Sequence, residues 1–337
     1  MGGPDTLHLV SDDLEVVLLP NNGADIYGFT DRRSGIDVLF KSPWDGAVPR
    51  GEYDGSSSME RWIARYWGGW QVLLPNGGDE CVENGVTWGY HGEAATRQWD
   101  VIDADEGSAS LAVRLFTVPL IVRRTISLTG PVVRITETVI NDSDVPLEVM
   151  WSHHPAFGAP FLDASCVIDI GCRTVITDDD APGTFLNPGA RFTWPLATDA
   201  RGEQVDLSVV PGPDERRSLL AYLGDFTEGF YAITNRNLGL GFGLRWPQEI
   251  FSHAWLWQEV HSTQAWPWFR RAYAMAIEPA STIPGHGMAT ARSKGYAGLV
   301  LAPRASRTVD IDAVIFRGAG RVAGIDEGGT VRFGETA

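Results

Sequence analysis

Hydrophobic and polar residues alternate along most of the chain with the two-residue period of β-strands. Strands are predicted at 14–19, 36–40, 108–116, 120–128, 132–140, 146–153, 230–234, 241–246, 272–277 and 308–316, with turns rich in Gly, Pro, Asn and Asp between many of them. Only residues 58–66 favour a helix. Short strands at this spacing predict an all-β protein, a large antiparallel sandwich or barrel of roughly 20 or more strands. No low-complexity linker divides the chain, so we expect a single domain over residues 1–337.

Composition narrows the class of protein. The 44% hydrophobic and 21% charged residues are typical of a globular chain. The net charge of −16 disfavours nucleic acid as a partner. No apolar run is long enough to span a membrane and no secretory signal is visible, so we expect a cytoplasmic protein. The three cysteines form no CxxC pair, and dinucleotide and P-loop motifs are absent, so we expect no metal and no cofactor. The oligomeric state stays open, and a homodimer is compatible with the sequence.

Polar residues gather in a glycine-rich stretch after an apolar run. It reads Leu74-Pro-Asn-Gly-Gly-Asp79 and continues to Tyr90-His-Gly-Glu93. Such a turn presents the Asn76 amide and the Asp79 carboxylate to a polar ligand. The spacing of His91 and Glu93 puts both on one face if the segment is a strand. The alternative is a bulged hairpin with a surface histidine.

Two further segments carry candidate acid–base groups. In a strand over 146–153 and beyond, His153 and His154 point to opposite faces, and Pro155 restrains the backbone of His154. In the strand near 272–277, one face carries only alanines and ends at Glu278, which precedes a proline. A carboxylate beside such a small-residue face is partly desolvated, which raises its pKa towards that of a general base. The alternatives are an ordinary pair of one buried and one exposed histidine, and a glutamate that meets solvent or an arginine.

Tryptophan is abundant, with 13 residues in two main clusters. Trp255 and Trp257 share one face of a predicted strand. They form either a core stripe or a platform on which the apolar face of a sugar ring stacks.

Five segments together resemble the aldose 1-epimerase (galactose mutarotase-like) superfamily. They occur in the family's order and cover roughly residues 67–280, on an all-β background. The segments are Leu74-Pro-Asn-Gly-Gly-Asp79, Tyr90-His-Gly-Glu93, Trp151-Ser-His-His-Pro-Ala-Phe157, Ala254-Trp-Leu-Trp-Gln258 and Ala276-Ile-Glu-Pro279.

The resemblance implies a large antiparallel β-supersandwich with a sugar cleft on one concave sheet. Glu278 matches the family's catalytic base, His154 its general acid, and His91 the histidine that contacts the ring oxygen or a neighbouring hydroxyl. The base and the acid would lie on opposite sides of the sugar ring.

The resemblance also suggests sugar-binding residues. Asn76 falls where the family has an Asn-Arg-Ile-like element, but Gly77-Gly78 replaces Arg-Ile here, which removes a polar sugar contact. Asp225 is the candidate for a further binding aspartate of the family. The remaining proposed sugar contacts are Asp79, Glu93, Trp257 and Gln258.

The expected activity is therefore interconversion of the anomers of a free sugar by acid–base opening and closure of the ring. One alternative is a related isomerase or epimerase that acts on an unusual keto or deoxy sugar, and another is a carbohydrate-binding protein without catalysis. Glycoside hydrolysis would need a second carboxylate opposite Glu278, for which Asp79 or Glu93 is available. A phosphorylated sugar would need nearby arginines, for which the candidates are Arg65, Arg97 and Arg270.

Overall fold

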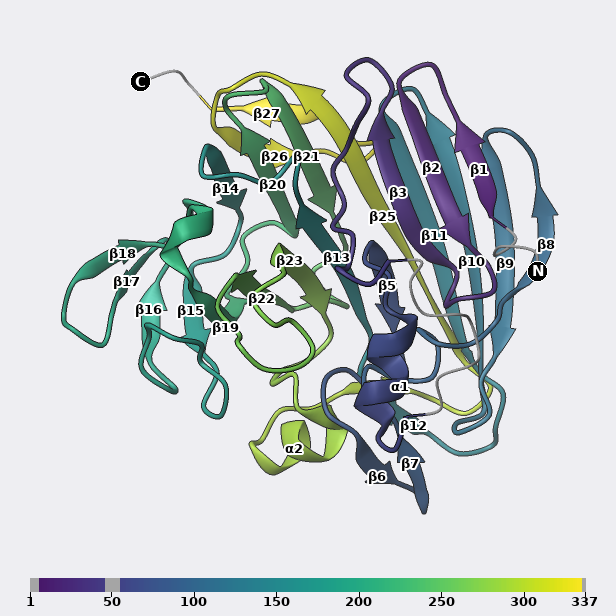
Figure 1. Cartoon of the computed structure of the whole chain (residues 1–337). Helices are drawn as coiled ribbons and strands as arrows, with labels where there is room; N and C mark the ends of the chain where they lie inside the picture. Colours follow the sequence, from purple (N-terminus) through teal and green to yellow (C-terminus); the bar gives the residue numbers. More distant parts are fainter. Residues whose placement is uncertain (1–5, 46–54, 335–337) are drawn as a thin grey trace.

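Two large antiparallel sheets dominate the computed structural model, which describes residues 6–45 and 55–334 (Figure 1). The 13-stranded sheet has the order β1 (Leu7–Val10), β2 (Leu14–Leu19), β3 (Asp25–Asp31), β5 (Trp70–Leu73), β13 (Ser152–Gly158), β23 (Tyr273–Ala280), β22 (His253–Val260), β19 (Ser218–Gly224), β15 (Thr174–Thr177), β16 (Arg191–Thr193), β17 (Leu196–Thr198) and β18 (Gln204–Asp206), with β4 (Ile36–Asp37) beside β3. The eight-stranded sheet has the order β14 (Cys166–Ile170), β20 (Phe230–Asn235), β21 (Leu240–Arg245), β25 (Ser306–Arg317), β11 (Val132–Asn141), β10 (Leu120–Thr129), β9 (Ser108–Arg114) and β8 (Asp100–Ala104).

Short elements decorate these sheets. They are the strand pairs β6 (Cys81–Glu83) with β7 (Val86–Trp88), β12 (Leu147–Val149) with β24 (Leu299–Leu301), and β26 (Val322–Ile325) with β27 (Val331–Phe333), the helices α1 (Ser58–Arg65) and α2 (Gly287–Ser293), and one 3₁₀ turn, Pro213–Glu215. The described residues thus hold 27 strands. The prediction of a large all-β antiparallel sandwich is confirmed.

The main core lies between the two large sheets. Phe242 of β21 contacts the rings of Phe29 in β3, Trp70 in β5 and Phe157 in β13, with ring centroids 4.9 to 6.4 Å apart. β1 also packs over β9 and β10, as Figure 1 shows. Edge-to-face aromatic pairs of this kind add about 0.5–1.5 kcal/mol each beyond the burial of their area. A hydrophobic cluster that runs from Leu9 to Ile315 is compatible with one domain over residues 1–337, which stays a prediction.

The hairpin of β10 and β11 shows how the sequence pattern produces the core. Its residues alternate between buried and partly exposed positions, and the two strands pair from Leu120–Asn141 to Thr129–Val132 without a break. One buried position of each strand carries a charge: Arg124 Nε donates to Glu137 Oε2 at 2.7 Å, and both side chains are at most 1% exposed. The ion pair satisfies two charges that would otherwise be costly to bury.

The predicted strand at 146–153 is in fact two strands. β12 pairs with β24 in a small sheet, whereas β13, separated from β12 by two residues, joins the 13-stranded sheet. Between them, Met150 donates its N–H to the carbonyl of Pro75, and Trp151 donates its N–H to Ser281 Oγ. The backbone therefore changes partners at this point, which a continuous apolar pattern does not reveal.

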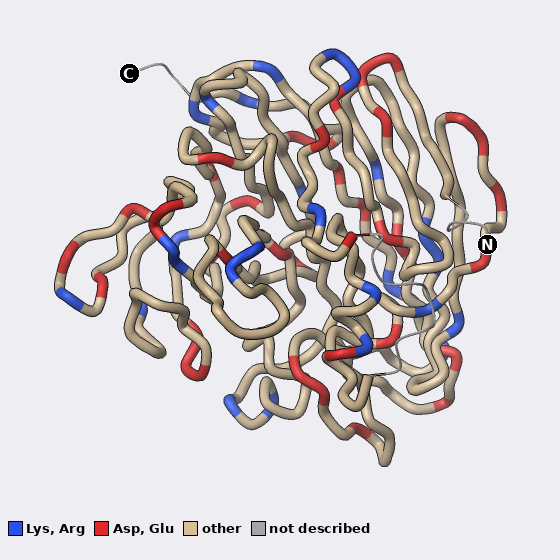
Figure 2. The backbone as a smooth tube through the Cα atoms, in the orientation of Figure 1, with Lys and Arg blue, Asp and Glu red and all other residues tan. Residues whose placement is uncertain are grey.

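Helix α1 confirms the one helix predicted from the sequence. Ser57 Oγ accepts a hydrogen bond from the N–H of Glu60 and caps its first turn. Helix α2 was not predicted, because its seven residues are too few to show a helical period. Neither of these helices is long and apolar enough to cross a membrane, and the described residues form no other α-helix. Acidic residues are spread over loops and strand ends across the molecule (Figure 2).

Candidate functional site

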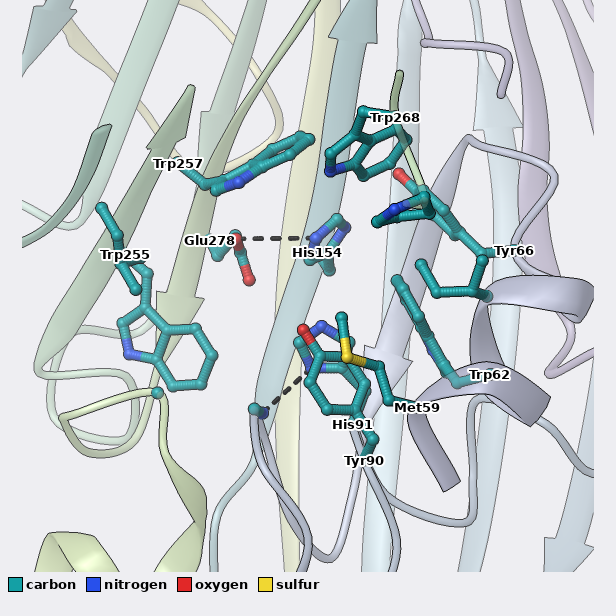
Figure 3. A pocket seen from close by; sticks show the side chains of 15 residues that line it. Met59, Trp62, Tyr66, Tyr90, His91, His154, Trp255, Trp257, Trp268 and Glu278 are labelled. Atoms are coloured by element: carbon teal, nitrogen blue, oxygen red, sulfur yellow. Dashed lines mark hydrogen bonds and ion pairs between the residues drawn. The ribbon is translucent and has the colours of Figure 1, made fainter. Parts of the chain in front are cut away.

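A pocket opens on the face of the 13-stranded sheet that points away from the second sheet (Figure 3). The alternation along β13 decides which histidine reaches it. His153 points into the core, where Trp70 Nε1 donates to its Nδ1 at 3.2 Å and Glu137 of β11 lies 3.7 Å from its Nε2. His154 points to the opposite face and lines the pocket. The predicted opposite orientation of the two histidines is confirmed.

Strand register brings the candidate acid and base together. β13 pairs with β23, and Ser152 lies opposite Ala280 while Ala156 lies opposite Ala276. Midway between these two pairs, His154 lies opposite Glu278. On the other side of β23, Trp255 of β22 lies directly opposite Glu278. Three neighbouring strands therefore contribute His154, Glu278 and Trp255 in one row across the sheet.

His154 and Glu278 form a close buried pair. His154 Nε2 lies 3.6 Å from Glu278 Oε1, and the side chains are only 7% and 3% exposed. Burial raises the pKa of Glu278 well above its ordinary value and lowers the pKa of His154 to about 4. Both shifts favour the neutral forms, which are the carboxylic acid of Glu278 and the uncharged imidazole of His154. Their separation leaves no room for a sugar ring between these two atoms, so the expectation of opposite sides of the ring is corrected: they reach a substrate from one side.

His91 is fixed by the glycine-rich loop. Its Nδ1 accepts a hydrogen bond from the backbone N–H of Gly78 at 3.0 Å. The backbone N–H of His91 donates in turn to the carbonyl of Gly78. Nδ1 is thus an acceptor, so the neutral ring carries its proton on Nε2 and can donate from there. Burial, with a smaller contribution from His154, holds the pKa of His91 well below its ordinary value, which keeps the ring neutral.

The backbone at His91 is strained, which excludes a strand, one of the two interpretations of this segment. His91 has φ +56° and Gly92 φ +79°, and a Cβ on Gly92 would lie 2.5 Å from the carbonyl oxygen of Leu74. The segment is therefore a tight turn, and His91 and Glu93 do not share a strand face. Left-handed conformations of non-glycine residues are costly and are found preferentially at functional sites.

The rest of the lining is largely aromatic. The pocket encloses about 630 Å³ of free space, open solvent at its mouth included. Its lining residues are Met59, Trp62, Ile63, Tyr66, Gly78, Tyr90, His91, His154, Leu220, Trp255, Trp257, Pro267, Trp268, Glu278 and Gly285. Figure 3 shows the rings of Trp255, Trp257, Trp268 and Trp62 around the central Glu278 and His154.

Several buried polar atoms of this lining have no hydrogen-bond partner among the described residues. They are Glu278 Oε2, His154 Nδ1, Tyr66 Oη and Trp62 Nε1. Buried polar groups are normally paired, because an unpaired one costs about 1–3 kcal/mol. Four unpaired atoms on the residues of one pocket therefore point to a polar ligand there.

Glycines make room for Trp255. A Cβ at Gly77 would lie 2.7 Å from Trp255 Cη2, and a Cβ at Gly285 would lie 3.0 Å from Trp255 Cζ3. The indole N–H donates to the carbonyl of Thr282 and is thus already used. Gly77 therefore leaves room for a tryptophan ring at the pocket.

A second polar network holds the pocket loops together. His286 Nδ1 lies 2.7 Å from Asp79 Oδ2, and its Nε2 lies 2.8 Å from Asp178 Oδ2. Tyr222 donates to Asp178 and accepts the N–H of Gly285. The hydrogen bonds that the ring donates to Asp178 and Asp79 raise the pKa of His286 to about 10. For Asp178, burial alone would raise the pKa, but hydrogen bonds from His286 and Tyr222 outweigh burial and lower it.

Asp178, Asp180 and His286 are the only described residues whose ligand atoms converge closely enough to suggest a metal site. Both ring nitrogens of His286 already bond to carboxylates, so the ring has no free nitrogen for a metal ion.

The loop residues predicted as sugar contacts lie outside the pocket lining. The Asn76 amide is buried and links the carbonyls of Asp79 and Gly89 to the N–H of Met288. Asp79 pairs with His286, as described above. The Glu93 carboxylate accepts the backbone N–H groups of residues 116 and 117. In this structure all three stabilise loops.

Of the later predicted contacts, only Trp257 reaches the pocket. Gln258 points to the opposite face of β22, where its amide contacts Met275 Sδ at 3.7 Å. Asp225 is exposed and pairs with Arg191 outside the lining. The structure thus brings together His91, His154, Glu278 and Trp257, and leaves Gln258 and Asp225 apart from them.

Sequence reasoning did not assign Trp62, Tyr66, Tyr90 and Trp268 to the site. A signal for helix α1 was available, because Met59, Trp62, Ile63 and Tyr66 recur at helical spacing and form one face. No comparable signal existed for Trp268, which lies in a loop and stacks on Trp44.

Solved structures share this fold over nearly the whole chain. The Slr1438 protein from Synechocystis sp. PCC 6803 is 16% identical with a TM-score of 0.67, covering 94% of this chain and 97% of its own. A galactose mutarotase related enzyme from Lactobacillus acidophilus is 14% identical with a TM-score of 0.65, covering 93% and 98%. A galactose mutarotase-like protein from Clostridium acetobutylicum is also 14% identical with a TM-score of 0.65, covering 93% and 95%.

These likenesses confirm the predicted resemblance at the level of the fold. No curated protein matches the sequence. A family model described as a domain of unknown function, DUF4432, matches residues 2–315. The chain therefore belongs to the DUF4432 family and has the galactose mutarotase-like fold.

Proposed function

We propose that this protein interconverts the anomers of a free sugar. The observation that carries the proposal is the buried pair of His154 and Glu278, whose facing atoms lie 3.6 Å apart. Mutarotation needs one base and one acid at neighbouring oxygens, and this pair supplies one of each. The fold of galactose mutarotase-like structures supports the same reaction class.

The reaction balances with these groups alone. A base takes the proton of the O1 hydroxyl, an acid protonates the ring oxygen, and the bond between C1 and the ring oxygen breaks to leave an open-chain aldehyde. Rotation of the aldehyde group and closure on its other face give the other anomer and return both protons. O1 and the ring oxygen are bonded to the same carbon, so two groups on one side of the substrate can reach both.

We assign Glu278 as the base and His154 as the acid. Burial favours the acid form of Glu278 before the reaction. Its proton passes to His154, which leaves Glu278 as the carboxylate that takes the O1 proton and His154 as the imidazolium that protonates the ring oxygen. His91 donates from Nε2 and holds a sugar oxygen in place. Each proton transfer of this type contributes about a hundredfold or more in rate.

Two other reaction classes find less support. Glycoside hydrolysis needs a second carboxylate across the pocket, but Asp79 and Glu93 bind elsewhere and no other carboxylate lines the pocket among the described residues. A phosphorylated sugar needs cations, but Arg65 and Arg97 line a different depression, and no described Lys or Arg lines this one.

Polarimetry or saturation-transfer NMR across a panel of free aldoses, ketoses and sugar phosphates tests the proposal. We expect turnover of at least one free sugar, and a loss of about a hundredfold or more in kcat for Glu278→Gln. The matched control Glu106→Gln changes an exposed glutamate outside the pocket and is expected to retain kcat. Sugar binding to Glu278→Gln without any turnover by the wild-type protein would instead identify a carbohydrate-binding protein.

A further inference from the structure

Beyond the groups that the reaction uses, nearly all side-chain polar groups of the pocket are single N–H or O–H groups on aromatic rings. Among the described lining residues, none is Asp, Asn, Gln, Ser, Thr, Lys or Arg. Once Glu278 and His154 engage O1 and the ring oxygen, the remaining side-chain groups are the His91 Nε2–H, the hydroxyls of two tyrosines and the indole N–H groups of three tryptophans: Tyr66, Tyr90, Trp62, Trp257 and Trp268. All but the two hydroxyls can only donate, so the pocket holds few acceptors for the O–H groups of a sugar.

The backbone of the lining adds little. The backbone N–H of Gly78 donates to the His91 ring, and the Gly78 carbonyl accepts a hydrogen bond from the backbone N–H of His91. The N–H of Gly285 is committed to the Tyr222 hydroxyl, and the Trp255 indole to a carbonyl. These groups are therefore not free to bind sugar hydroxyls.

The other surfaces are apolar and firmly held. Trp257 packs on Trp268 at 5.6 Å between ring centroids, and Trp268 stacks on Trp44 at 5.3 Å. Trp255 is wedged against Gly77 and Gly285, where even a methyl group would collide with its ring. The faces of such rigid rings suit C–H, methyl and methylene groups and offer no hydrogen bond to a hydroxyl.

We propose that the substrate is a deoxy or O-methylated aldose without phosphate or carboxylate. This class presents CH₂, CH₃ or OCH₃ groups where common hexoses carry hydroxyls, which matches the tryptophan surfaces. A fully hydroxylated hexose would press hydroxyls against indole faces, which do not replace their hydrogen bonds to water, and each such hydroxyl is expected to lower kcat/KM about tenfold. An anionic sugar would in addition meet a pocket with no described cation in a chain of net charge −16. The inference rests on the proposed function, because it takes Glu278 and His154 as reserved for the reacting oxygens.

Matched pairs of sugars test the inference. The probes are galactose against its 6-deoxy form, glucose against its 2-deoxy and 6-deoxy forms, glucose against 3-O-methylglucose, and glucose 6-phosphate. We expect at least one deoxy or methylated sugar to exceed its parent in kcat/KM by about tenfold or more, and no turnover of the phosphate. If each parent sugar is turned over as efficiently as its deoxy or methylated forms, the proposed substrate class is wrong and the proposed activity is unaffected.

Binding measurements separate this inference from the activity. Dissociation constants for the same pairs are measured with the Glu278→Gln variant, which should not turn sugars over. Tighter binding of a deoxy or methylated sugar, together with no turnover by the wild-type protein, overturns the activity and supports the substrate class. If no probe is bound or turned over, both are overturned.

A variant locates the preference in the aromatic surface. Trp257→Gln puts an amide where the indole lies, so the deoxy-to-parent ratio of kcat/KM is expected to fall about tenfold. The matched control is Trp194→Gln, at a partly buried tryptophan outside the lining, which should leave the ratio unchanged. A ratio that both variants leave unchanged contradicts the role given to the indole.

Discussion

Gly78 joins two loops of the pocket so closely that only glycine fits. It has φ +73°, and a Cβ there would lie 1.6 Å from the carbonyl oxygen of Gly285. Gly85, in the turn between β6 and β7, has a similar φ of +83°, but a Cβ there would meet nothing within 4 Å. The two glycines therefore differ in the space around them and not in backbone conformation.

The substitution Gly78→Ala is expected to be markedly destabilising. A left-handed alanine costs about 1–2 kcal/mol, and relief of the backbone collision costs about 1–3 kcal/mol more. We expect a loss of about 2–5 kcal/mol for Gly78→Ala, and only about 1–2 kcal/mol for Gly85→Ala. Both replacements change the entropy of the unfolded chain alike, so the difference measures the collision.

Urea unfolding monitored by tryptophan fluorescence measures both free energies. A second readout is turnover of the sugar under conditions in which each variant is folded. Gly78→Ala should lower kcat because the N–H of this residue orients His91, and Gly85→Ala should not. Equal losses of stability in the two variants would refute the reasoning from the 1.6 Å approach.

Two further predictions concern residues that hold the loops of the site. Folding raises the pKa of His286 from 6.5 to about 10, so its stabilisation is fully present below pH 6.5 and is lost as the pH rises through about 10. Between pH 7 and 10.5, the melting temperature of the wild-type protein should therefore fall by about 2 °C or more further than the melting temperature of His286→Gln. Equal falls in the two proteins would contradict this prediction. Glu93→Gln weakens charged hydrogen bonds to backbone N–H groups, so we expect a loss of about 1–3 kcal/mol in unfolding free energy with unchanged KM. A large rise in KM at unchanged stability would instead restore Glu93 as a sugar contact.

Some predicted site residues failed to reach the pocket for a common physical reason. Glu93 follows His91 and Gly92, whose positive φ angles turn the chain and send the carboxylate to another loop. Gln258 follows Trp257 in a strand, so alternation sends it to the opposite face. Proximity in sequence to a site residue therefore does not place a side chain in the site.

The sequence by itself determined the elements and the faces of this protein. Alternation of apolar residues specified the strands, the helical spacing of residues 58–66 specified α1, and the adjacency of His153 and His154 required that they point apart. These features depend on local backbone geometry, which neighbouring residues control.

Only the tertiary structure decided which strands became neighbours. The pairing of β13 with β23 places Glu278 beside His154, and the loop contacts of Gly78 aim His91 at the same pocket. The alternation along a strand specifies which of its faces is buried, but it does not specify which other strand pairs with it, because many strands share the same alternation. The choice among such partners is made by packing and hydrogen bonding over the whole chain, because those energies depend on residues far apart in sequence.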